Sequence, residues 1–391
     1  MEVRPGYKQT EVGVIPEDWE VARIADIAEV KTGPFGSALH ERDYVHDGTP
    51  IITVEHLGEL GVTTNNLPLV SATDRRRLRA YSLDIDDIVF SRVGSVDRNA
   101  LIRETEAGWL FSGRLLRVRP RKKRAYAPYL SYQFHGESFK QRVRDVAVGQ
   151  TMASLNTSIL RNVKVVLPTL PEQRAITEAL GDVDALIAGL ERLIAKKRDL
   201  KQAAMQQLLT GQTRLPGFSG EWEAKRLGHV LRVRHGKSQR HVAAADGIYP
   251  ILATGGEIGR TDHYLYDKPS VLIGRKGTID EPQYAETPFW TIDTLFFTEI
   301  ANDASPKFIF YMFKTIKWRS YNEASGVPSL NASTIENIEV RLPKLREQTA
   351  IATVLSDMDA EIEALERRLA KTRALKQGMM QELLTGRTRL V

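Results

Sequence analysis

Two short loops combine an arginine with glycine and a hydroxyl side chain. They span residues 91–95 (Ser-Arg-Val-Gly-Ser) and 274–278 (Gly-Arg-Lys-Gly-Thr), and each follows a β-rich run. Glycine lets the backbone approach a ligand closely, and an arginine can donate two hydrogen bonds to guanine. The loops indicate contact with nucleic acid, although an exposed turn carrying a base would also explain them. The candidate residues are Arg92, Gly94, Ser95 and Arg98 in the first region, and Arg275, Lys276, Gly277 and Thr278 in the second.

A second pair of segments precedes the same Leu-Asn dipeptide, at Leu155-Asn156 and at Leu330-Asn331. Their small and polar residues are expected to join the same surface, while Asn156 and Asn331 themselves fit structural turns or helix caps. The candidates are Gly149, Gln150 and Thr151 in the first segment, and Gly326 and Ser329 in the second.

Basic residues gather in two further stretches. Residues 114–124 hold seven arginines and lysines, and residues 225–240 hold six, among them Lys237. Such side chains on loops neutralise phosphates and supply a salt-dependent binding energy. For residues 122–124, a solvated turn before a helix is an equally good interpretation.

Catalytic chemistry finds little support in the sequence. The chain has no cysteine and no Pro-Pro, so thiolate sites and the Asn/Asp-Pro-Pro-Tyr/Phe motif of base methyltransferases are absent. Gly236-Lys237-Ser238 ends like a phosphate-binding loop, but position 231 is leucine instead of the required glycine. The eight histidines show no helical i,i+4 pairing. We expect no catalytic residue and no metal site.

The elements that must position these candidates are organised by a long internal repeat. Residues 155–215 and 330–390 align without a gap and share 35 identities in 61 positions. Between the repeats lie two variable regions, which share a sparse pattern of Pro, Gly and Trp but differ in length, the first being about 22 residues longer, mostly within 57–80. The chain therefore contains two copies of one unit with different loops.

Each repeat copy predicts a helix of about 38–40 residues, or ~60 Å. Apolar residues alternate at spacings of three and four, which is a heptad seam. Acidic residues crowd the first half of each helix and basic residues the second, which favours antiparallel pairing, although each helix could merely complement its own dipole. The alternative is a helix buried separately in each domain. The seam residues are Ile176, Leu180, Val183, Ile187, Leu190 and Ile194 in the first helix, and Ile351, Leu355, Met358, Ile362, Leu365 and Leu369 in the second.

The variable regions predict short strands broken by Gly-rich loops, of α/β or α+β type. Each is followed by one helix, roughly 128–146 and 306–321, with proline in the first turn. A terminal strand then follows in each copy, at 163–167 and 338–342.

Composition limits the class of protein. The 391 residues carry a net charge of +6, which favours a polyanionic partner. No apolar run approaches the ~18 residues of a membrane helix, and the first residues do not form a signal peptide. We therefore expect a cytoplasmic protein with no membrane partner.

Taken together, three sets of motifs resemble the DNA-specificity subunit of type I restriction–modification systems. They are residues 7–19 (Tyr-Lys-Gln-Thr-Glu-Val-Gly-Val-Ile-Pro-Glu-Asp-Trp), the twin Leu-Pro-x-Leu-x-Glu-Gln units at 167–173 and 342–348, and the twin Leu-Leu-Thr-Gly-x-Thr-Arg-Leu endings at 208–215 and 383–390. The similarity spans essentially the whole chain.

The resemblance implies an α+β fold with two pseudo-twofold-related target recognition domains, separated by two long antiparallel coiled-coil helices. The corresponding segments are a first recognition domain at 1–167, a first helix at 168–212, a second recognition domain at 213–342 and a second helix at 343–391. Each recognition domain would read one half of a bipartite, asymmetric site in double-stranded DNA, and the helices would set the spacer.

The resemblance also implies a chain that is not catalytic by itself and binds no cofactor. It would assemble with methyltransferase subunits and, for cleavage, with a motor-nuclease subunit. S-adenosylmethionine, ATP and Mg are then expected on those partner subunits. The alternative is a non-catalytic coiled-coil scaffold that joins two protein-binding modules, and a stand-alone enzyme is disfavoured by the missing motifs.

Overall fold

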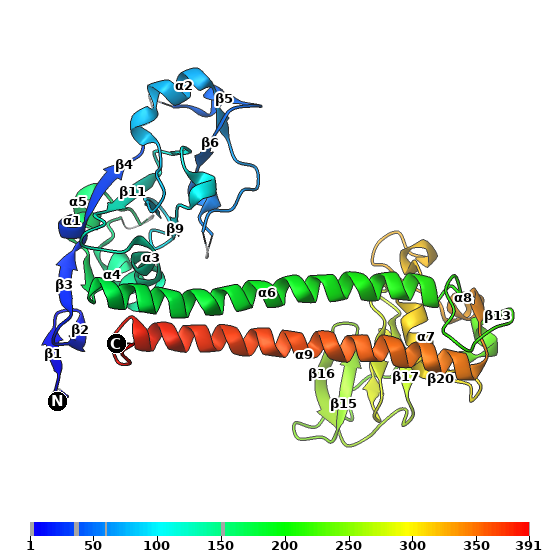
Figure 1. Ribbon diagram of the computed structural model, residues 1–391. Helices are drawn as coiled ribbons and strands as arrows, with labels where there is room; N and C mark the ends of the chain where they lie inside the picture. Colours follow the sequence, from blue (N-terminus) through cyan, green and yellow to red (C-terminus); the bar gives the residue numbers. More distant parts are fainter. Residues whose placement is uncertain (1–3, 35–38, 59–60, 150–152, 391) are drawn as a thin grey trace. The chain divides into compact units, whose positions relative to one another are not determined.

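The computed structural model describes residues 4–34, 39–58, 61–149 and 153–390. The chain divides into two compact units (Figure 1). Unit 1 comprises Met1–Gly189 together with Leu369–Val391, and unit 2 comprises Leu190–Arg368. Each unit contains one variable region and half of each long helix, so both helices pass from one unit into the other.

Unit 1 contains two four-stranded sheets. The larger has the antiparallel order β4-β11-β8-β9, and the smaller has the order β10-β6-β7-β5 with a parallel β10–β6 pair. The strands of the larger sheet are β4 (Ala28–Thr32), β8 (Ile88–Ser91), β9 (Asn99–Leu101) and β11 (Leu115–Pro120). Those of the smaller sheet are β5 (Tyr44–Val45), β6 (Thr49–Ile52), β7 (Leu69–Val70) and β10 (Leu110–Phe111).

Unit 2 repeats this topology with a reduced second sheet. Its larger sheet has the order β14-β20-β17-β18, and its smaller sheet has the order β16-β15-β19 with a parallel β15–β19 pair. The strands of the larger sheet are β14 (Leu231–His235), β17 (Ser270–Gly274), β18 (Gln283–Ala285) and β20 (Leu295–Ile300). Those of the smaller sheet are β15 (Tyr249–Ala253), β16 (Gly256–Thr261) and β19 (Trp290–Thr291).

A two-stranded antiparallel ribbon leads into the long helix in each unit. The strand before each long helix pairs with the strand that opens the domain. The ribbons are β3 (Glu20–Arg23) with β12 (Lys164–Leu167), and β13 (Glu223–Arg226) with β21 (Glu339–Leu342). At the N-terminus β1 (Tyr7–Thr10) forms a hairpin with β2 (Gly13–Pro16).

The other helices are short, and several of them contact strands of the larger sheets. The α-helices are α1 (Ile24–Ile27), α2 (Ala72–Arg77), α3 (Ala127–His135), α4 (Glu137–Val146), α5 (Thr157–Asn162), α7 (Pro306–Phe313) and α8 (Ala332–Glu336). The 3₁₀ turns are η1 (Glu41–Asp43), η2 (Val54–His56), η3 (Arg79–Tyr81), η4 (Glu104–Glu106), η5 (Leu227–His229) and η6 (Trp318–Tyr321).

The prediction of one helix at 128–146 and one at 306–321 was wrong. Gly136 adopts an extended backbone between α3 and α4, which ends one helix and starts the next. In unit 2, α7 ends at Phe313 and the chain continues as the separate turn η6.

The two long helices are α6 (Leu170–Leu208) and α9 (Leu345–Leu383), each of 39 residues. In unit 1, Ile176 of α6 shares a core with Leu383 at the end of α9. In unit 2, Leu208 at the end of α6 shares a core with Ile351 of α9. Within each unit, the start of one helix packs beside the end of the other, so the paired segments run antiparallel. The expected α+β fold with two like domains and two long helices is thereby confirmed.

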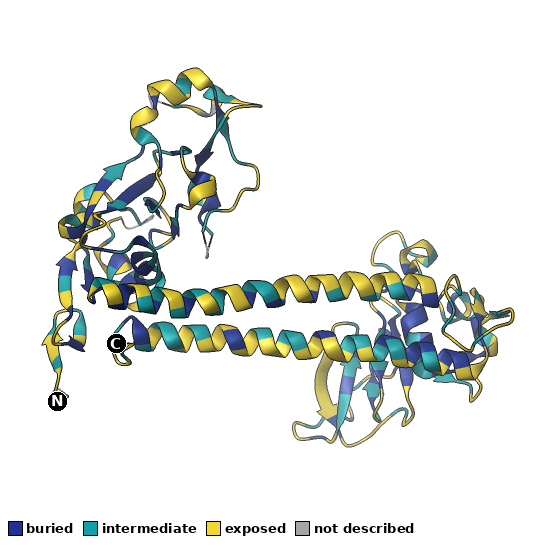
Figure 2. Ribbon diagram, viewed as in Figure 1, coloured by how far each residue is buried: buried dark blue, intermediate teal, exposed yellow. Residues whose placement is uncertain are grey.

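Buried and half-buried positions alternate with exposed ones along both helices (Figure 2), and all twelve seam residues are buried or half-buried. Ile176, Leu180, Ile187, Leu190, Ile194, Ile351, Leu355 and Ile362 are buried. Val183, Met358, Leu365 and Leu369 are half-buried. Within the described ranges, no helix has the length and apolarity to cross a membrane.

Candidate nucleic-acid interface

In unit 1 the structure brings the predicted loop at 92–95 beside residues 153–155, which come shortly after the predicted segment at 149–151. The loop at 92–95 follows β8, and the segment at 153–155 precedes α5. The amide of Leu155 donates to the carbonyl of Arg92 at 2.8 Å, and the amide of Gly94 donates to the carbonyl of Ala153 at 2.8 Å. These bonds fix the two segments side by side, although about 60 residues of chain separate them.

Unit 2 repeats this arrangement. The amide of Leu330 donates to the carbonyl of Arg275 at 2.9 Å, and the amide of Gly277 donates to the carbonyl of Pro328 at 2.9 Å. Gly94 and Gly277 have φ of +76° and +88°, a left-handed backbone that favours glycine. We call the two hydrogen-bonded segments of each unit the loop–hairpin frame, which comprises residues 92–95 with 153–155 in unit 1 and residues 275–278 with 328–330 in unit 2.

A third segment reaches the same edge of the larger sheet. Gly236 packs directly against the backbone of Ile292, because a Cβ atom added to it would lie 2.0 Å from the carbonyl oxygen of Ile292. Gly33 of unit 1 packs in the same way against the carbonyl oxygen of Ser112. Lys237, which follows Gly236, donates a hydrogen bond from its backbone amide to the carbonyl of Thr291 at 2.8 Å. Arg275 donates its amide to Thr294, at the other end of the same turn, at 2.8 Å.

The turn at 291–294 therefore gathers three basic residues of unit 2. Lys237 and Lys276 are exposed, and neither ammonium has an ion-pair or hydrogen-bond partner in the described part of the chain. The half-buried Arg275 donates one hydrogen bond to the carbonyl of Asp293, at 3.3 Å. The exposed lysine side chains supply positive charge and hydrogen-bond donors, which suits a phosphate-bearing ligand.

The basic side chains of unit 1 contact their own domain more closely than those of unit 2 do. The Arg92 guanidinium lies 3.5 Å from both the hydroxyl of Thr32 and the carbonyl of Gly113. The exposed Arg98 donates to the carbonyl of Leu57. These contacts hold both arginines at the edge of the larger sheet.

The remaining small and polar candidates lie on or beside the frames. Ser95, Gly149 and Gly326 are exposed, and Thr278 and Ser329 are half-buried. Gln150 and Thr151 lie outside the described residues. An exposed valine lies beside each frame: Val148 in unit 1, which pairs with Ser154, and Val327 in unit 2, which precedes Pro328 and is 65% exposed. Val327 lies inside the predicted segment at 326–329, whereas sequence reasoning missed Val148 because an isolated apolar residue carries no periodic signal.

The expectation that the basic run at 114–124 neutralises phosphates needs correction. Arg117 and Arg119 lie on β11 and not on a loop, so their partners come from neighbouring strands and loops. Arg117 pairs with Glu29 at 2.9 Å, and Arg119 pairs with the buried Asp87 at 2.7 Å. The hydrogen bond to Asp87 raises the pKa of Arg119. These arginines are occupied within the fold.

The basic run at 225–240 is also partly neutralised. Lys225 pairs with Glu223 at 3.0 Å, and Arg234 pairs with Glu299 at 2.8 Å. Lys237 and Arg240 lie beyond β14 and are exposed. Two members of this run thus face solvent on the loop that follows β14.

The two asparagines are confirmed as helix caps. The side chain of Asn156 accepts a hydrogen bond from the amide of Ile159 at 2.8 Å, and that of Asn331 accepts one from Ser333 at 3.2 Å. Each starts a short helix directly after a loop–hairpin frame, so the frame and the helix share one anchor.

The repeated motifs hold each domain onto the long helices. Arg389 pairs with the buried Glu172 in unit 1, and Arg214 pairs with the buried Glu347 in unit 2, each with an Nε–Oε1 distance of 2.5 Å. In each unit, the glutamate of the Glu-Gln motif in one repeat copy thus forms an ion pair with the arginine of the Thr-Arg-Leu ending in the other copy. Trp19 adds a hydrogen bond to Glu172 at 2.9 Å.

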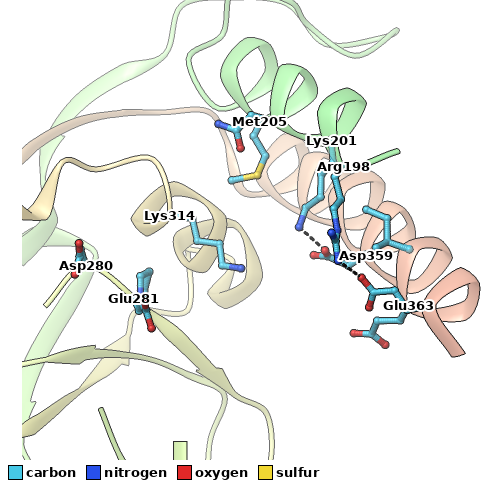
Figure 3. Close-up of a pocket in the computed structure, with 12 residues that line it drawn as sticks. Arg198, Lys201, Met205, Asp280, Glu281, Lys314, Asp359 and Glu363 are labelled. Carbon is cyan, nitrogen blue, oxygen red and sulfur yellow. Dashed lines mark hydrogen bonds and ion pairs between the residues drawn. The ribbon is translucent and has the colours of Figure 1, made fainter. Parts of the chain in front are cut away.

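Unit 2 also contains a cleft of 590 Å³ between α6, α9 and the end of α7 (Figure 3). Arg198, Lys201 and Lys314 line it together with Asp280 and Asp359. Burial lowers the pKa of Lys314, and the charge of Lys201 lowers it further. The described residues contain no cluster of His, Asp and Glu that could hold a metal ion.

The chain has two domains of one topology, and both are held on long helices. Each domain has a basic loop–hairpin frame at one edge of its larger sheet. This arrangement is typical of proteins that carry a pair of recognition modules. The sequence matches the family described as type I restriction modification DNA specificity domain over residues 16–197 and 219–372. These matches cover most of the chain, which therefore belongs to this family.

Individual relatives agree with this assignment. A protein of Methanocaldococcus jannaschii assigned as the type I restriction enzyme MjaX specificity subunit is 27% identical, over 98% of this chain and 97% of its own length. The crystal structure of a type I restriction–modification S subunit from M. genitalium is similar, with a TM-score of 0.64, 16% identity and 98% of both chains covered. The HsdS subunit from Thermoanaerobacter tengcongensis has a TM-score of 0.52, with 15% identity and coverage of 95% and 98%.

Proposed function

We propose that this chain is the DNA-reading subunit of a type I restriction–modification complex, in which each recognition domain reads one half of a bipartite site in double-stranded DNA. The observation that carries the proposal is the loop–hairpin frame, built by the same backbone hydrogen bonds in both units. A repeated frame with different side chains provides two readers of related geometry and different sequence preference.

The differences between the two readers favour an asymmetric site. The frame of unit 1 presents Arg92 and Ser95, whereas that of unit 2 presents Arg275, Lys276 and Thr278. Unit 1 also carries β7 and α2 in the segment where its variable region is longer. Unlike side chains on a like backbone read unlike bases, so the half-sites should differ in sequence.

The chain is proposed to be non-catalytic and to act with methyltransferase subunits, and with a motor-nuclease subunit for cleavage. S-adenosylmethionine, ATP and Mg would then be held by those partners. Exposed leucines at equivalent repeat positions support docking of more than one copy of a partner. Leu200 on α6 is 49% exposed and Leu375 on α9 is 58% exposed, and they lie 175 positions apart, as the repeats do.

The long helices are proposed to set the spacer between the half-sites. Each helix extends ~58 Å at 1.5 Å per residue, which exceeds the ~34–36 Å of one DNA turn. Each recognition domain packs against part of each helix, so we expect the spacer to be shorter than one full helix.

Genome-wide mapping of methylated adenines tests the proposal. Cells that hold the methyltransferase subunit with and without this chain are compared, and a third strain carries a variant in which residues 221–328 are replaced by a different recognition domain. We expect a bipartite motif that requires the chain, and a variant motif changed in one half only. Methylation that does not depend on the chain would leave the protein-binding scaffold as the better explanation.

A further inference from the structure

A lysine, an aspartate and a tyrosine form the same cluster in both units. In unit 1 the hydroxyl of Tyr132 donates to Asp184 at 2.7 Å, and Lys376 pairs with the same carboxylate at 2.6 Å. The Lys376 ammonium also lies 5.7 Å from the centroid of the Tyr132 ring. The three groups therefore contact one another pairwise.

Unit 2 builds the equivalent cluster from different parts of the chain. The hydroxyl of Tyr311 donates to Asp359 at 2.7 Å, Lys201 pairs with Asp359, and the Lys201 ammonium lies 5.4 Å from the Tyr311 ring centroid. Figure 3 shows Lys201 and Asp359 facing each other across α6 and α9. We call these two sets the Lys–Asp–Tyr clusters.

Each cluster joins three separate elements. In each unit the lysine comes from one long helix, the aspartate from the other, and the tyrosine from the short helix of the recognition domain, α3 or α7. The lysines and the aspartates are each 175 positions apart, which is the offset of the repeat. The cluster is thus the point where both long helices and the recognition domain meet.

A second attachment lies at the start of the same short helix. The side-chain oxygen of Gln173 accepts from the amide of Tyr126 at 2.8 Å, and that of Gln348 accepts from the amide of Ser305 at 2.9 Å. Both glutamines are buried, and each also donates to the proline carbonyl just before its long helix. Tyr126 and Ser305 are the residues that cap α3 and α7.

Two attachment points fix a direction, whereas one point leaves a rotation free. The glutamine and the aspartate are 11 residues apart on the long helix in both units, or ~16 Å along its axis. Their partners are six residues apart along α3 and along α7. The two contacts therefore hold the short helix in one orientation relative to the long one, and the rest of the recognition domain follows that orientation.

The lysine side chains of both clusters are largely shielded from solvent, which strengthens their ion pairs with the aspartates. Lys376 and Lys201 have side chains only 14% and 13% exposed. Burial raises the pKa of both tyrosines, and the hydrogen bond to aspartate raises it further in each. Both hydroxyls therefore remain protonated and donate at neutral pH. Hydrogen bonds to a charged acceptor are among the stronger ones in proteins.

We infer that Tyr132 and Tyr311 are positioning residues for DNA specificity: each locks its recognition domain at one angle on the paired helices, and the pair of locked angles fixes the spacing of the half-sites. This rests on the proposed function. The tyrosines lie on α3 and α7 and are not part of the loop–hairpin frames, so they should control spacing without changing which bases are read.

The test uses the complex of the full chain with its methyltransferase subunit. Its substrate is a DNA library in which the two half-sites are separated by spacers of different lengths, and methylation is counted for each length. Tyr311→Phe and Tyr132→Phe keep the ring and remove only the hydroxyl. Tyr266→Phe is the matched control, since its half-buried hydroxyl has no hydrogen-bond partner in the described ranges.

The wild type is expected to methylate one spacer length. In each Tyr→Phe variant at the clusters, methylation of spacers one base pair shorter or longer should rise at least about tenfold, the factor that corresponds to losing a hydrogen bond to a charged group. The half-site sequences should stay the same, and the control should match the wild type.

Three results would overturn the inference: unchanged spacer profiles in both variants, a change in the bases read, or a fall in melting temperature that accounts for lost methylation. A wild-type complex that shows no bipartite motif would instead refute the proposed function, which the wild-type arm detects before any variant is compared.

Discussion

Arg389, in the Thr-Arg-Leu ending of the second repeat copy, pairs through two nitrogens with the carboxylate of Glu172, which is fully buried at the start of α6. The same guanidinium reaches Asp18 at 2.8 Å and lies 5.6 Å from the centroid of the Trp19 ring. One arginine thus joins the end of the second repeat copy to the start of the first and to the opening segment of unit 1.

Replacing Arg389 with alanine should destabilise unit 1 markedly. The change leaves the buried carboxylate of Glu172 with a single side-chain donor, from Trp19. Removing one partner of a buried pair costs about 3 kcal/mol or more, because the other charge stays desolvated. Denaturant unfolding of the purified chain measures this loss.

Arg387→Ala is the matched control for that experiment. Arg387 lies in the same tail, and its side chain is exposed and 3.7 Å from the exposed Glu382. Exposed pairs contribute little, so this variant should unfold nearly as the wild type does. Equal losses in both variants would show that the Glu172 pair has no special role.

Acid should weaken the same junction. The hydrogen bond from Arg389 holds the pKa of Asp18 below its usual value. A carboxyl group whose pKa is lower in the folded than in the unfolded state stabilises the fold above its unfolded-state pKa, about 3.9 for Asp. That contribution disappears as the pH falls through the lowered folded-state value.

Asp18→Asn should therefore have a lower melting temperature than the wild type at pH 7, and the gap should narrow as the pH falls below about 4. Melting curves across this range give the comparison. Glu17→Gln serves as control, since the Glu17 side chain takes part in no ion pair within the described ranges. A difference in melting temperature between Asp18→Asn and the wild type that does not change with pH would contradict this explanation.

Changes at the frame of unit 2 should separate base contacts from phosphate contacts. Arg275→Ala should relax one half of the target by about 1–3 kcal/mol if its guanidinium contacts a base. Lys276→Ala should weaken binding to all sequences alike and lower the salt dependence by about one phosphate contact. Arg92→Ala should relax the other half-site. Methylation profiles and binding at several salt concentrations distinguish these outcomes.

Lys268→Ala is the control for the frame, because Lys268 is exposed just before β17 whereas Arg275 and Lys276 follow that strand. It should leave affinity and specificity unchanged. An effect as large as that of Lys276→Ala would mean that the frame is not the DNA-binding edge.

Lengthening both long helices should lengthen the spacer. One heptad added after Gly189 in α6 and another after Arg368 in α9 preserves the seam and adds about 10 Å to each helix. At ~3.4 Å per base pair, the spacer should grow by about three pairs, with both half-sites intact. Methylome sequencing of the variant would show this, and an active complex with the original spacer would exclude the helices as the ruler.

The sequence alone predicted the repeat, the two long helices and the asparagine caps. Each of these depends on local signals: identity at a fixed offset, apolar residues spaced by three and four, and a side chain that reaches an amide two or three residues away. Arg92 and Arg275 could be singled out for the same reason, because a loop after a strand can be recognised from neighbouring residues. Such features need no knowledge of which distant segments meet.

Only the tertiary structure decided which charged residues are occupied and which are exposed. Arg117 and Lys276 look alike in the sequence, yet strand pairing places Glu29 beside the first and leaves the second in solvent. The joining of Gly94 to Ala153, and of Tyr132 to Asp184 and Lys376, likewise depends on contacts across 50 to 250 residues. Contacts of that range are set by how sheets and helices pack, and no local pattern records them.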